Sequence, residues 1–585
     1  MGLAERKKEG FEAASSAMDD NSLLGDTVEG VVDYKDRPAI RSKTGRWRSA
    51  GFIIGVEIAE RFSYVGIGSN LITYLTGPLE QSTVSAAVNV NTWSGVASMT
   101  PLLGAFVADA YLGRYRTVIF ASILYVLGLG LLTLSAMIPS FVPHSCENDI
   151  NKTSCHPPEY QIILFFSSLY LVALAQGGHK PCVQAFGADQ FDGQHTEESK
   201  SKSSFFNWWY FGMCAGIVCT NLVLTYIQDN LNWGLGFGIP CICMILALAV
   251  FLLGTKTYRY SVNVDNDNPF RRIVQVFVAA VRNRKATLPP TATVDEEGDG
   301  GTLPRRGATK QFRFLDKALA TVAEDSKKGW VVCSVDQVQE AKALLRLVPI
   351  WATCLVFALA DAQTSTFFTK QGATMDRRIG SRFKIPPASL QTFINISIVI
   401  FMPIYERVIV PIARVFTRKP SGITMLQRIG TGIFLAMMSM VVAALVERKR
   451  LQTAIDAKLV DIPGAIVPMS VWWLVPQYVL FGVADAFTRV GLQEFFYDQM
   501  PKALRSVGLA LYLSIFGVGS FLSSFLVSAI KNLTSEDGHD GWFPNNLNRA
   551  HLDYFYWLLA GVVALGLLFY LYFAKSYVYN RGYNI

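Results

Sequence analysis

Residues 119–138 read IFASILYVLGLGLLTLSAMI, a run without one charged side chain. About 20 apolar residues is the length that an α-helix needs to cross a bilayer. Because lipid cannot satisfy bare backbone groups, such a span must be helical. Stretches of the same character lie at 162–175, 239–253, 394–404 and 556–573. With a hydrophobic fraction of 51% and a charged fraction of 17%, the sequence predicts an all-α membrane protein.

The apolar stretches predict twelve transmembrane helices in two groups of six. The first group lies near 51–74, 88–110, 117–138, 160–185, 205–226 and 235–253; the second lies near 344–368, 388–410, 423–445, 467–487, 506–530 and 554–573. Two six-helix bundles joined by a long loop describe the major facilitator fold, in which substrate binds between the halves. We expect a cytosolic tail (1–48), an N-terminal bundle (49–254), a cytosolic linker with room for a lateral helix (255–340), a C-terminal bundle (341–575) and a second cytosolic tail (576–585).

The distribution of basic residues predicts which ends of the spans face the cytosol. Arg114, Arg116, Arg418 and the central linker all fall on one side. The cluster ERKR at 447–450 falls on the other side, and we interpret it as an extracytosolic amphipathic segment. The net charge of +8 reflects this bias and does not indicate a nucleic-acid partner.

Two polar loops on the extracytosolic side carry candidate modification sites. Cys146 and Cys155 share one loop with the sequon at Asn151, so this pair is a candidate disulfide. A second sequon is at Asn532, in another loop of that side. The sequon at Asn395 lies inside a predicted span and is disregarded.

The predicted first span carries polar groups on one face. Glu57, Glu60, Arg61 and Tyr64 are spaced i, i+3, i+4 and i+7, which places them on one helical stripe. Ionisable residues at this depth are costly, and they mark ion or substrate pathways more often than they serve structure. A carboxylate that alternates between a cation and a proton suits proton-coupled transport. A structural ion cluster that fixes Arg61 is the alternative.

The predicted fourth span adds a second cation. Lys180 ends an apolar block in the run QGGHKPC at 176–182 and is a candidate partner of Glu57. The alternative is that Lys180 extends toward the cytosolic face. His179 is left without a role, since a single histidine beside a lysine more often lines a helix without titrating.

The second half contributes charges as well. Asp361 interrupts the seventh span within FALADAQ at 357–363, Asp485 and Arg489 interrupt the tenth, and Glu494 follows it. We expect Glu494 to face the cations of the first half, forming a bipolar site for a zwitterion or for an anion travelling with a proton. Asp485 and Arg489 stand at i, i+4 and could simply neutralise each other.

These motifs resemble those of the proton-dependent oligopeptide transporter family, in its plant peptide/nitrate branch. Residues 57–64 look like its ExxER motif, 177–192 with 205–209 resemble its signature, and 109–114 resemble the facilitator loop. The resemblance implies proton coupling through Glu57, Glu60, Arg61 and Lys180, and substrate contacts from Arg61, Tyr64, Lys180, Asp361, Gln363 and Glu494. It places Glu494 at the tenth-helix glutamate position and Lys180 at the fourth-helix lysine. Protons are the expected coupling ion, with no cofactor and no metal.

Asp361 departs from the nitrate-carrying members, which can place a histidine at this point of the seventh helix. An acid there repels nitrate unless it is protonated or paired, and it favours a cationic or amine-bearing substrate. A di- or tripeptide, nitrate and a specialised metabolite all stay open, because the fold does not fix the cargo.

The N-terminal tail bears on location. The first forty-odd residues are polar, so we expect no cleavable signal peptide. Asp19, Leu23 and Leu24 have the acidic dileucine form read by sorting adaptors. In a plant cell this form is compatible with vacuolar delivery, and we expect the tonoplast slightly ahead of the plasma membrane.

Three functional classes follow. A proton symporter for a small solute is the first, supported by ionisable residues in both halves. A transceptor of the same fold, with the linker as a docking segment, is the second. A membrane enzyme is the third, and we do not expect it because six scattered histidines suggest neither a catalytic dyad nor a metal cluster.

Overall fold

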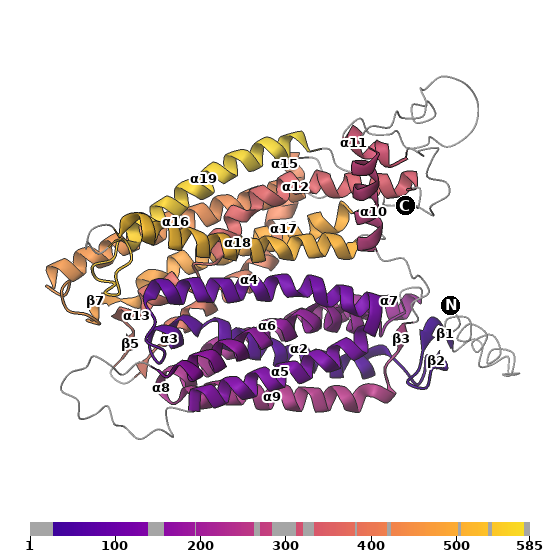
Figure 1. Ribbon diagram of the computed structural model, residues 1–585, viewed down its shortest axis with the longest axis horizontal. Helices are drawn as coiled ribbons and strands as arrows, with labels where there is room; N and C mark the ends of the chain where they lie inside the picture. The colour runs from indigo at the N-terminus through magenta and orange to yellow at the C-terminus, as the bar shows by residue number, and fades with distance from the viewer. Residues whose placement is uncertain are drawn as a thin grey trace, which may run out of the picture.

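Long helices run side by side and gather into two groups (Figure 1). The computed structural model describes residues 27–137, 157–192, 195–261, 269–283, 312–319, 333–380, 383–417, 423–500, 505–535 and 541–577. Helices of the first half, indigo to magenta, form one group, and those of the second half, orange to yellow, form the other. The predicted disulfide (Cys146, Cys155), the sequon at Asn151 and the sorting signal (Asp19, Leu23, Leu24) lie outside the described residues.

The first half is built from six long helices and two short ones. They are α2 (Arg46–Gly68), α3 (Leu71–Thr76), α4 (Thr83–Val107), α5 (Arg114–Met137), α6 (Glu159–Ala188), α7 (Thr196–Cys219), α8 (Thr225–Asn230) and α9 (Trp233–Leu253). A π-helical segment, Thr220–Leu224, joins α7 to α8. The starts of α4 and α9 are fixed by side-chain caps from Ser82 and Asn232.

The second half repeats this pattern with more interruptions. It contains α12 (Val335–Asp361), α13 (Phe367–Ala373), α14 (Thr392–Ile404), α15 (Val410–Thr417), α16 (Met425–Asp456), α17 (Val475–Asp498), α18 (Arg505–Thr534) and α19 (Leu552–Ser576). Capping boxes at Ser334 and Thr424 start α12 and α16. The sequon residue Asn532 is exposed in the last turn of α18 rather than in a loop.

Nine stretches among the described residues are long and apolar enough to cross a membrane. The three other long helices are α2, α4 and α17. Their lengths match the predicted spans, but α2 and α17 carry buried ionisable residues and α4 is rich in small polar residues. The prediction of an all-α membrane protein is confirmed, and the apolar criterion covers nine of the twelve expected spans.

Several predicted spans have different boundaries in the structure. The first breaks where α2 ends at Gly68 and α3 begins at Leu71, and the ninth continues to Asp456. The seventh breaks where α12 ends at Asp361, and α13 begins only at Phe367 after a turn. The tenth begins at Val475 rather than near 467, because Val467–Ser470 forms strand β7, which pairs in parallel with β4 (Met375–Asp376). The helix then continues to Asp498, so Glu494 lies inside it.

The two ends of the molecule are distinguished by the elements that they carry. We call the end that carries β1 and α10 the cytosolic end, and the end that carries α3 and α13 the extracytosolic end, following the charge-based orientation (Figure 1).

The halves contact each other along α4 and α18 and at their extracytosolic ends. On the long helices, Asn91 donates to Ser523 at 2.9 Å. Beyond them, Lys370 of α13 donates to Thr76 of α3 at 3.0 Å. Two further contacts in this extracytosolic part are the hydrogen bond from Gln391 to the Ser69 carbonyl and the hydrogen bond between Thr225 and Ser389. These contacts join the two halves on the extracytosolic side.

Two of the four residues in the cluster at 447–450, Glu447 and Arg450, are buried, whereas Arg448 and Lys449 are exposed. Glu447 and Arg450 have exposed fractions of 0% and form an ion pair at 2.6 Å within α16. Arg450 also donates to Asn548 Oδ1 and to the Leu547 carbonyl, both at 2.8 Å, and Gln371 of α13 donates to Glu447 at 2.8 Å. The segment predicted to be amphipathic is thus a turn of α16, and its buried face holds a charged pair rather than apolar side chains.

A small sheet ties the N-terminal chain to the cytosolic end. Strands β1 (Thr27–Val32), β2 (Pro38–Ile40) and β3 (Tyr260–Ser261) pair antiparallel in the order β2-β1-β3. Since β3 follows α9, the segment before α2 is joined to the end of the first six-helix group. The sequence predicts a polar cytosolic tail over 1–48, and the part of this tail that forms β1 and β2 is folded.

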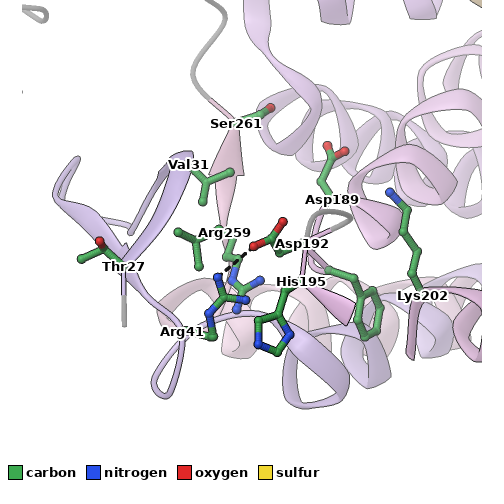
Figure 2. A pocket seen from close by; sticks show the side chains of 11 residues that line it. Thr27, Val31, Arg41, Asp189, Asp192, His195, Lys202, Arg259 and Ser261 are labelled. Atoms are coloured by element: carbon green, nitrogen blue, oxygen red, sulfur yellow. Dashed lines mark hydrogen bonds and ion pairs between the residues drawn. The ribbon is translucent and has the colours of Figure 1, made fainter. Parts of the chain in front are cut away.

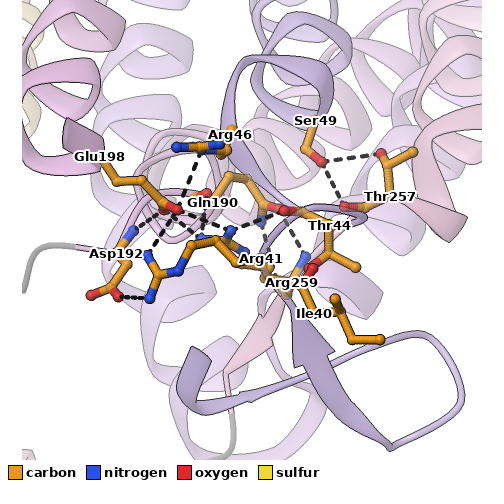
Figure 3. A network of polar contacts seen from close by, with 10 residues as sticks. All are labelled: Ile40, Arg41, Thr44, Arg46, Ser49, Gln190, Asp192, Glu198, Thr257 and Arg259. Atoms are coloured by element: carbon orange, nitrogen blue, oxygen red, sulfur yellow. Dashed lines mark hydrogen bonds and ion pairs between the residues drawn. The ribbon is translucent and has the colours of Figure 1, made fainter. Parts of the chain in front are cut away.

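Buried charges fasten this sheet (Figure 3). Glu198 at the start of α7 accepts from Arg259 at 2.6 Å and from Arg41 at 3.0 Å. Burial alone would raise the pKa of Glu198, but hydrogen bonds from Arg259 and the Asp192 amide, with the charges of Arg259 and Arg41, hold it below its usual range. Glu198 is thus a charged anchor for the N-terminal segment.

The two linker helices among the described residues pack on the second half. Helix α10 (Pro269–Arg282) and α11 (Arg313–Asp316) cover the cytosolic extension of α12. Arg272 donates to Glu340 at 2.9 Å, and Lys342, which is fully buried, pairs with Asp316 at 2.6 Å.

Candidate functional site

The ionisable stripe of the first span is buried inside the first half. Glu57, Glu60 and Arg61 are exposed by 2%, 0% and 7%. The Arg61 guanidinium lies 3.3 Å from Glu57 Oε1 and makes a close ion pair with Glu60. Tyr125 of α5 donates to the other oxygen of Glu60 at 3.4 Å. One guanidinium therefore holds two carboxylates.

Tyr64 lies one turn further along the same stripe. The Arg61 guanidinium is 5.6 Å from the centre of its ring, within the range of a cation–π contact. The ring also stacks on Trp93 of α4, with centroids 5.2 Å apart. The sequence prediction that these residues share one face is confirmed by these contacts.

Lys180 of α6 lies close to this group without replacing Arg61. The charged groups that act on it are Glu57, Glu60 and Arg61 of α2, and Arg489 of α17 from the second half. Glu57 pairs with Arg61 in this conformation, so the expected Glu57–Lys180 pair is not the contact that forms. Lys180 instead lies where the charge sets of the two halves meet.

The second half contains a matching set. Arg489 donates to both oxygens of Asp361 at 2.9 Å each, and its Nε contacts Asp485 one turn earlier in α17. The guanidinium also lies 4.1 Å from the ring centre of Phe516. Here too one guanidinium holds two carboxylates, and with Asp361, Asp485 and Arg489 ionised the set carries one net negative charge.

The sequence reasoning found only part of this second set. The i, i+4 spacing of Asp485 and Arg489 indicated their pairing, but nothing in the spacing linked Arg489 to Asp361 on a different helix. The helix end at Asp361, which leaves this carboxylate paired with Arg489 of α17, is visible only in the structure.

Gln363 and Glu494 occupy less central positions. Gln363 is fully buried, and it donates to the Leu359 carbonyl at 2.9 Å and to Ser523 at 3.0 Å, within its own half. Glu494 has a side chain that is 48% exposed, and it lies 3.7 Å from Arg428 of α16. The structure therefore does not place Glu494 opposite Arg61 and Lys180 as expected. Asp485 is the α17 carboxylate that joins the central charge set.

One group of side chains could hold a cation. Glu57, Glu60 and His179 bring ligand atoms within 4.8 Å of one another, all of them buried. The Arg61 guanidinium already supplies a positive charge to both carboxylates.

A separate pocket opens at the cytosolic end (Figure 2). Its volume is about 550 Å³, and it is lined by Thr27, Val28, Val31, Arg41, Asp189, Phe191, Asp192, His195, Lys202, Arg259 and Ser261. Arg41 pairs with Asp192 at 2.8 Å across it. Arg41, Asp192 and Arg259 of its lining belong to the network that holds the sheet, whereas Asp189 pairs with Arg114 of α5. None of the predicted coupling or substrate residues lines this pocket.

Comparisons with known proteins agree with this arrangement. The model of the POT family matches residues 115–543. This chain belongs to the POT family. Protein NRT1/ PTR FAMILY 5.10 of Arabidopsis thaliana is 64% identical over 94% of this chain and 96% of that protein. Protein NRT1/ PTR FAMILY 5.12 of the same plant is 54% identical over 97% and 99%.

Solved structures of the POT family share the fold. An auto-inhibited POT family peptide transporter matches with a TM-score of 0.68 and 21% identity, over 92% of this chain and 99% of that one. A POT family transporter in complex with 5-aminolevulinic acid matches with a TM-score of 0.60 and 17% identity, over 90% and 96%. The predicted family and the major facilitator fold are thus confirmed. The protein is a multi-pass integral membrane transporter, not an enzyme.

Proposed function

We propose that this chain is a proton-coupled symporter that moves a small bipolar solute by alternating access. The observation that carries the proposal is the pair of matched charge sets, each with two carboxylates on one guanidinium: Glu57, Glu60 and Arg61 in the first half, and Asp361, Asp485 and Arg489 in the second. Such groups inside a membrane protein mark ion and substrate pathways.

Protonation gives each set a second state. A proton on Glu57 or Glu60 removes one of the two negative charges that hold Arg61, which frees part of the guanidinium for an anionic group of the substrate. Loss of the proton restores the ion pair and expels that group. Proton movement and substrate movement are linked in this way because both compete for one cation.

The charges favour a substrate with two opposite ends. Arg61 and Lys180 suit a carboxylate, and the net negative charge around Asp361 and Asp485 suits an amino group. A short peptide or an amino-acid-like metabolite meets both requirements, and one matching POT structure holds 5-aminolevulinic acid. Nitrate offers no group to the second set, so it requires protonated Asp361 or Asp485.

The two halves are joined on the extracytosolic side in this structure. The extracytosolic hydrogen bonds between α13 and α3, and between Gln391 and Ser69, must break for the opposite state to form. We favour the symporter over the transceptor because both charge sets needed for coupling are in place, and the described linker helices pack on α12.

The test is uptake into liposomes or oocytes of nitrate, of a dipeptide and of a mixed metabolite pool. Uptake is compared at about pH 5.5 and about pH 7.5, which bracket the ordinary imidazole titration. Acid-stimulated uptake that is lost in Glu60→Gln and kept in Glu159→Gln, an exposed glutamate at the start of α6, supports the proposal. No uptake of any solute by protein that reaches the membrane would overturn it.

We also propose delivery to the tonoplast through Asp19, Leu23 and Leu24. A fluorescent fusion carrying Leu23→Ala and Leu24→Ala should move from the vacuolar to the plasma membrane. An unchanged location excludes this signal.

A further inference from the structure

His179 of α6 is a fully buried histidine without a hydrogen-bond partner. Its exposed fraction is 0%, and neither Nδ1 nor Nε2 has a partner among the described residues. Its ring meets Tyr125 of α5 edge to face, with centroids 6.2 Å apart. Because buried polar groups in native proteins are nearly always hydrogen-bonded, an imidazole with two unpaired nitrogens requires an explanation.

Glu57 offers the complementary group. A ring nitrogen of His179 and an oxygen of Glu57 lie within 4.8 Å of each other, with a Glu60 oxygen in the same range. Glu57 Oε2 is itself buried without a partner. Proton transfer needs a separation of about 2.6–3.2 Å, which a change of the flexible glutamate side chain can supply.

The ionisable groups around His179 come from three helices. They are Glu57, Glu60, Arg61 and Tyr64 from α2, Tyr125 from α5, and Lys180 from α6 itself. Helix α4, which also packs on α6, contains no ionisable side chain between Thr83 and Val107. The membrane part of α7 offers Tyr210 and Cys214, which interact with each other.

The surroundings favour a proton over a metal ion at this place. A divalent cation would have to displace Arg61, which is bonded to both carboxylates and has a fixed positive charge. A proton adds to the same group without removing the guanidinium, and a neutral imidazole nitrogen is an acceptor that can take it up.

We infer that His179 is a proton-binding site of the first half that exchanges a proton with Glu57 during the transport cycle; this inference rests on the proposed symport function. The O–H bond of protonated Glu57 breaks and an N–H bond forms on His179. A neutral acid and a neutral imidazole become a carboxylate and an imidazolium, so the net charge is unchanged.

This transfer separates two tasks. Once the proton has moved to His179, the Glu57 carboxylate can bind Arg61 again while the proton stays inside the protein. The half then expels the anionic end of its substrate before it releases the proton. Without His179, release of the proton and recovery of the Glu57–Arg61 pair have to coincide.

A direct test measures the imidazole and not transport. Full-length protein with isotope-labelled histidine, in lipid, is titrated from about pH 8.5 to about pH 4.5 and followed by infrared difference spectroscopy. We expect one imidazolium signal that is absent in His179→Gln and present in His551→Gln, an exposed histidine that caps α19 without a side-chain hydrogen bond. An identical histidine spectrum in wild type and His179→Gln overturns the inference.

A transport test checks the role. In His179→Gln, we expect the acid stimulation of uptake to flatten and accumulation against a gradient to fall by about tenfold, while substrate exchange at equal pH persists. Adding His179→Gln to Glu57→Gln should cause little further loss, since both act on one proton. Wild-type-like accumulation in His179→Gln contradicts the inference. A wild type without acid stimulation refutes symport instead, and the infrared titration still decides whether His179 binds a proton.

Discussion

Arg489 of α17 binds Asp361 at the end of α12 through two hydrogen bonds of 2.9 Å. The same guanidinium contacts Asp485, so two helices and two carboxylates depend on one cation. Asp361 also marks the point where the seventh span breaks, with α13 and the extracytosolic contacts beyond it. This charge set therefore lies next in the chain to the segment that joins the two halves.

Removing Arg489 leaves two neighbouring carboxylates without a cation. We expect Arg489→Ala to abolish uptake and to lower the free energy of unfolding by about 2 kcal/mol, since the side chain is partly exposed. Thermal unfolding in detergent and liposome uptake measure the two effects. Arg489→Ala with Asp485→Asn should recover part of the stability without the transport. An Arg489→Ala variant as stable as wild type would contradict the conclusion that Arg489 neutralises both carboxylates.

Glu494 should be dispensable. Its carboxylate is half exposed and 3.7 Å from Arg428, a geometry that contributes less than about 1 kcal/mol. We expect Glu494→Gln to keep uptake within about twofold of wild type, whereas Asp485→Asn loses acid stimulation. Initial uptake rates at several substrate concentrations provide the comparison. Equal losses in the two variants would restore Glu494 to the central site.

The extracytosolic ion pair should be essential for stability. Arg450→Met leaves Glu447 charged and fully buried, which we expect to cost about 3–5 kcal/mol. Thermal unfolding is compared with Arg448→Met, an exposed neighbour on the same helix turn. Arg450→Met with Glu447→Gln should be more stable than Arg450→Met alone. Equal thermal stability of Arg448→Met and Arg450→Met would show that the buried ion pair does not stabilise this part of the fold.

The N-terminal sheet should loosen in acid. Burial opposes the charge of Glu198, but Arg259, the Asp192 amide and Arg41 lower its pKa below the ordinary value. A carboxyl whose folded pKa is depressed stabilises the fold above its unfolded pKa, and this contribution is lost as the pH falls through the folded pKa. We therefore expect the stability difference between wild type and Glu198→Gln to be large near neutral pH and to shrink below about pH 4.5.

Limited proteolysis of the segment around residues 27–46 follows this effect, with Glu159→Gln as the control. A constant difference between wild type and Glu198→Gln across the acid range would show that Glu198 is not ionised in the fold.

Local sequence signals were sufficient for most helices. The apolar runs placed α5, α6 and α9 to within a few residues, because length and hydropathy alone determine a lipid-facing span. The helical spacing of the first span likewise brought Glu57, Glu60 and Arg61 together, since all three share one helix.

Contacts between distant segments could not be obtained in this way. Val467–Ser470 is apolar enough to extend a span, yet it pairs as a strand with a segment about ninety residues away. Arg489 donates to Asp361 on another helix, and Arg259 donates to Glu198 at the cytosolic end. Each depends on tertiary packing, which helical periodicity does not encode.

The partners of Arg450 also differ in when the ribosome supplies them. Synthesis proceeds from the N-terminus, so Glu447, three residues earlier, is already present when Arg450 enters the bilayer. Asn548 and Leu547 are made 98 and 97 residues later. Glu447 can thus pair with Arg450 while the segment crosses the membrane, where an unpaired charge is costly. The hydrogen bonds from Arg450 to the last extracytosolic loop form only after that loop has been synthesised. A chain truncated before residue 547 would therefore leave Arg450 with Glu447 but without its two partners from this loop.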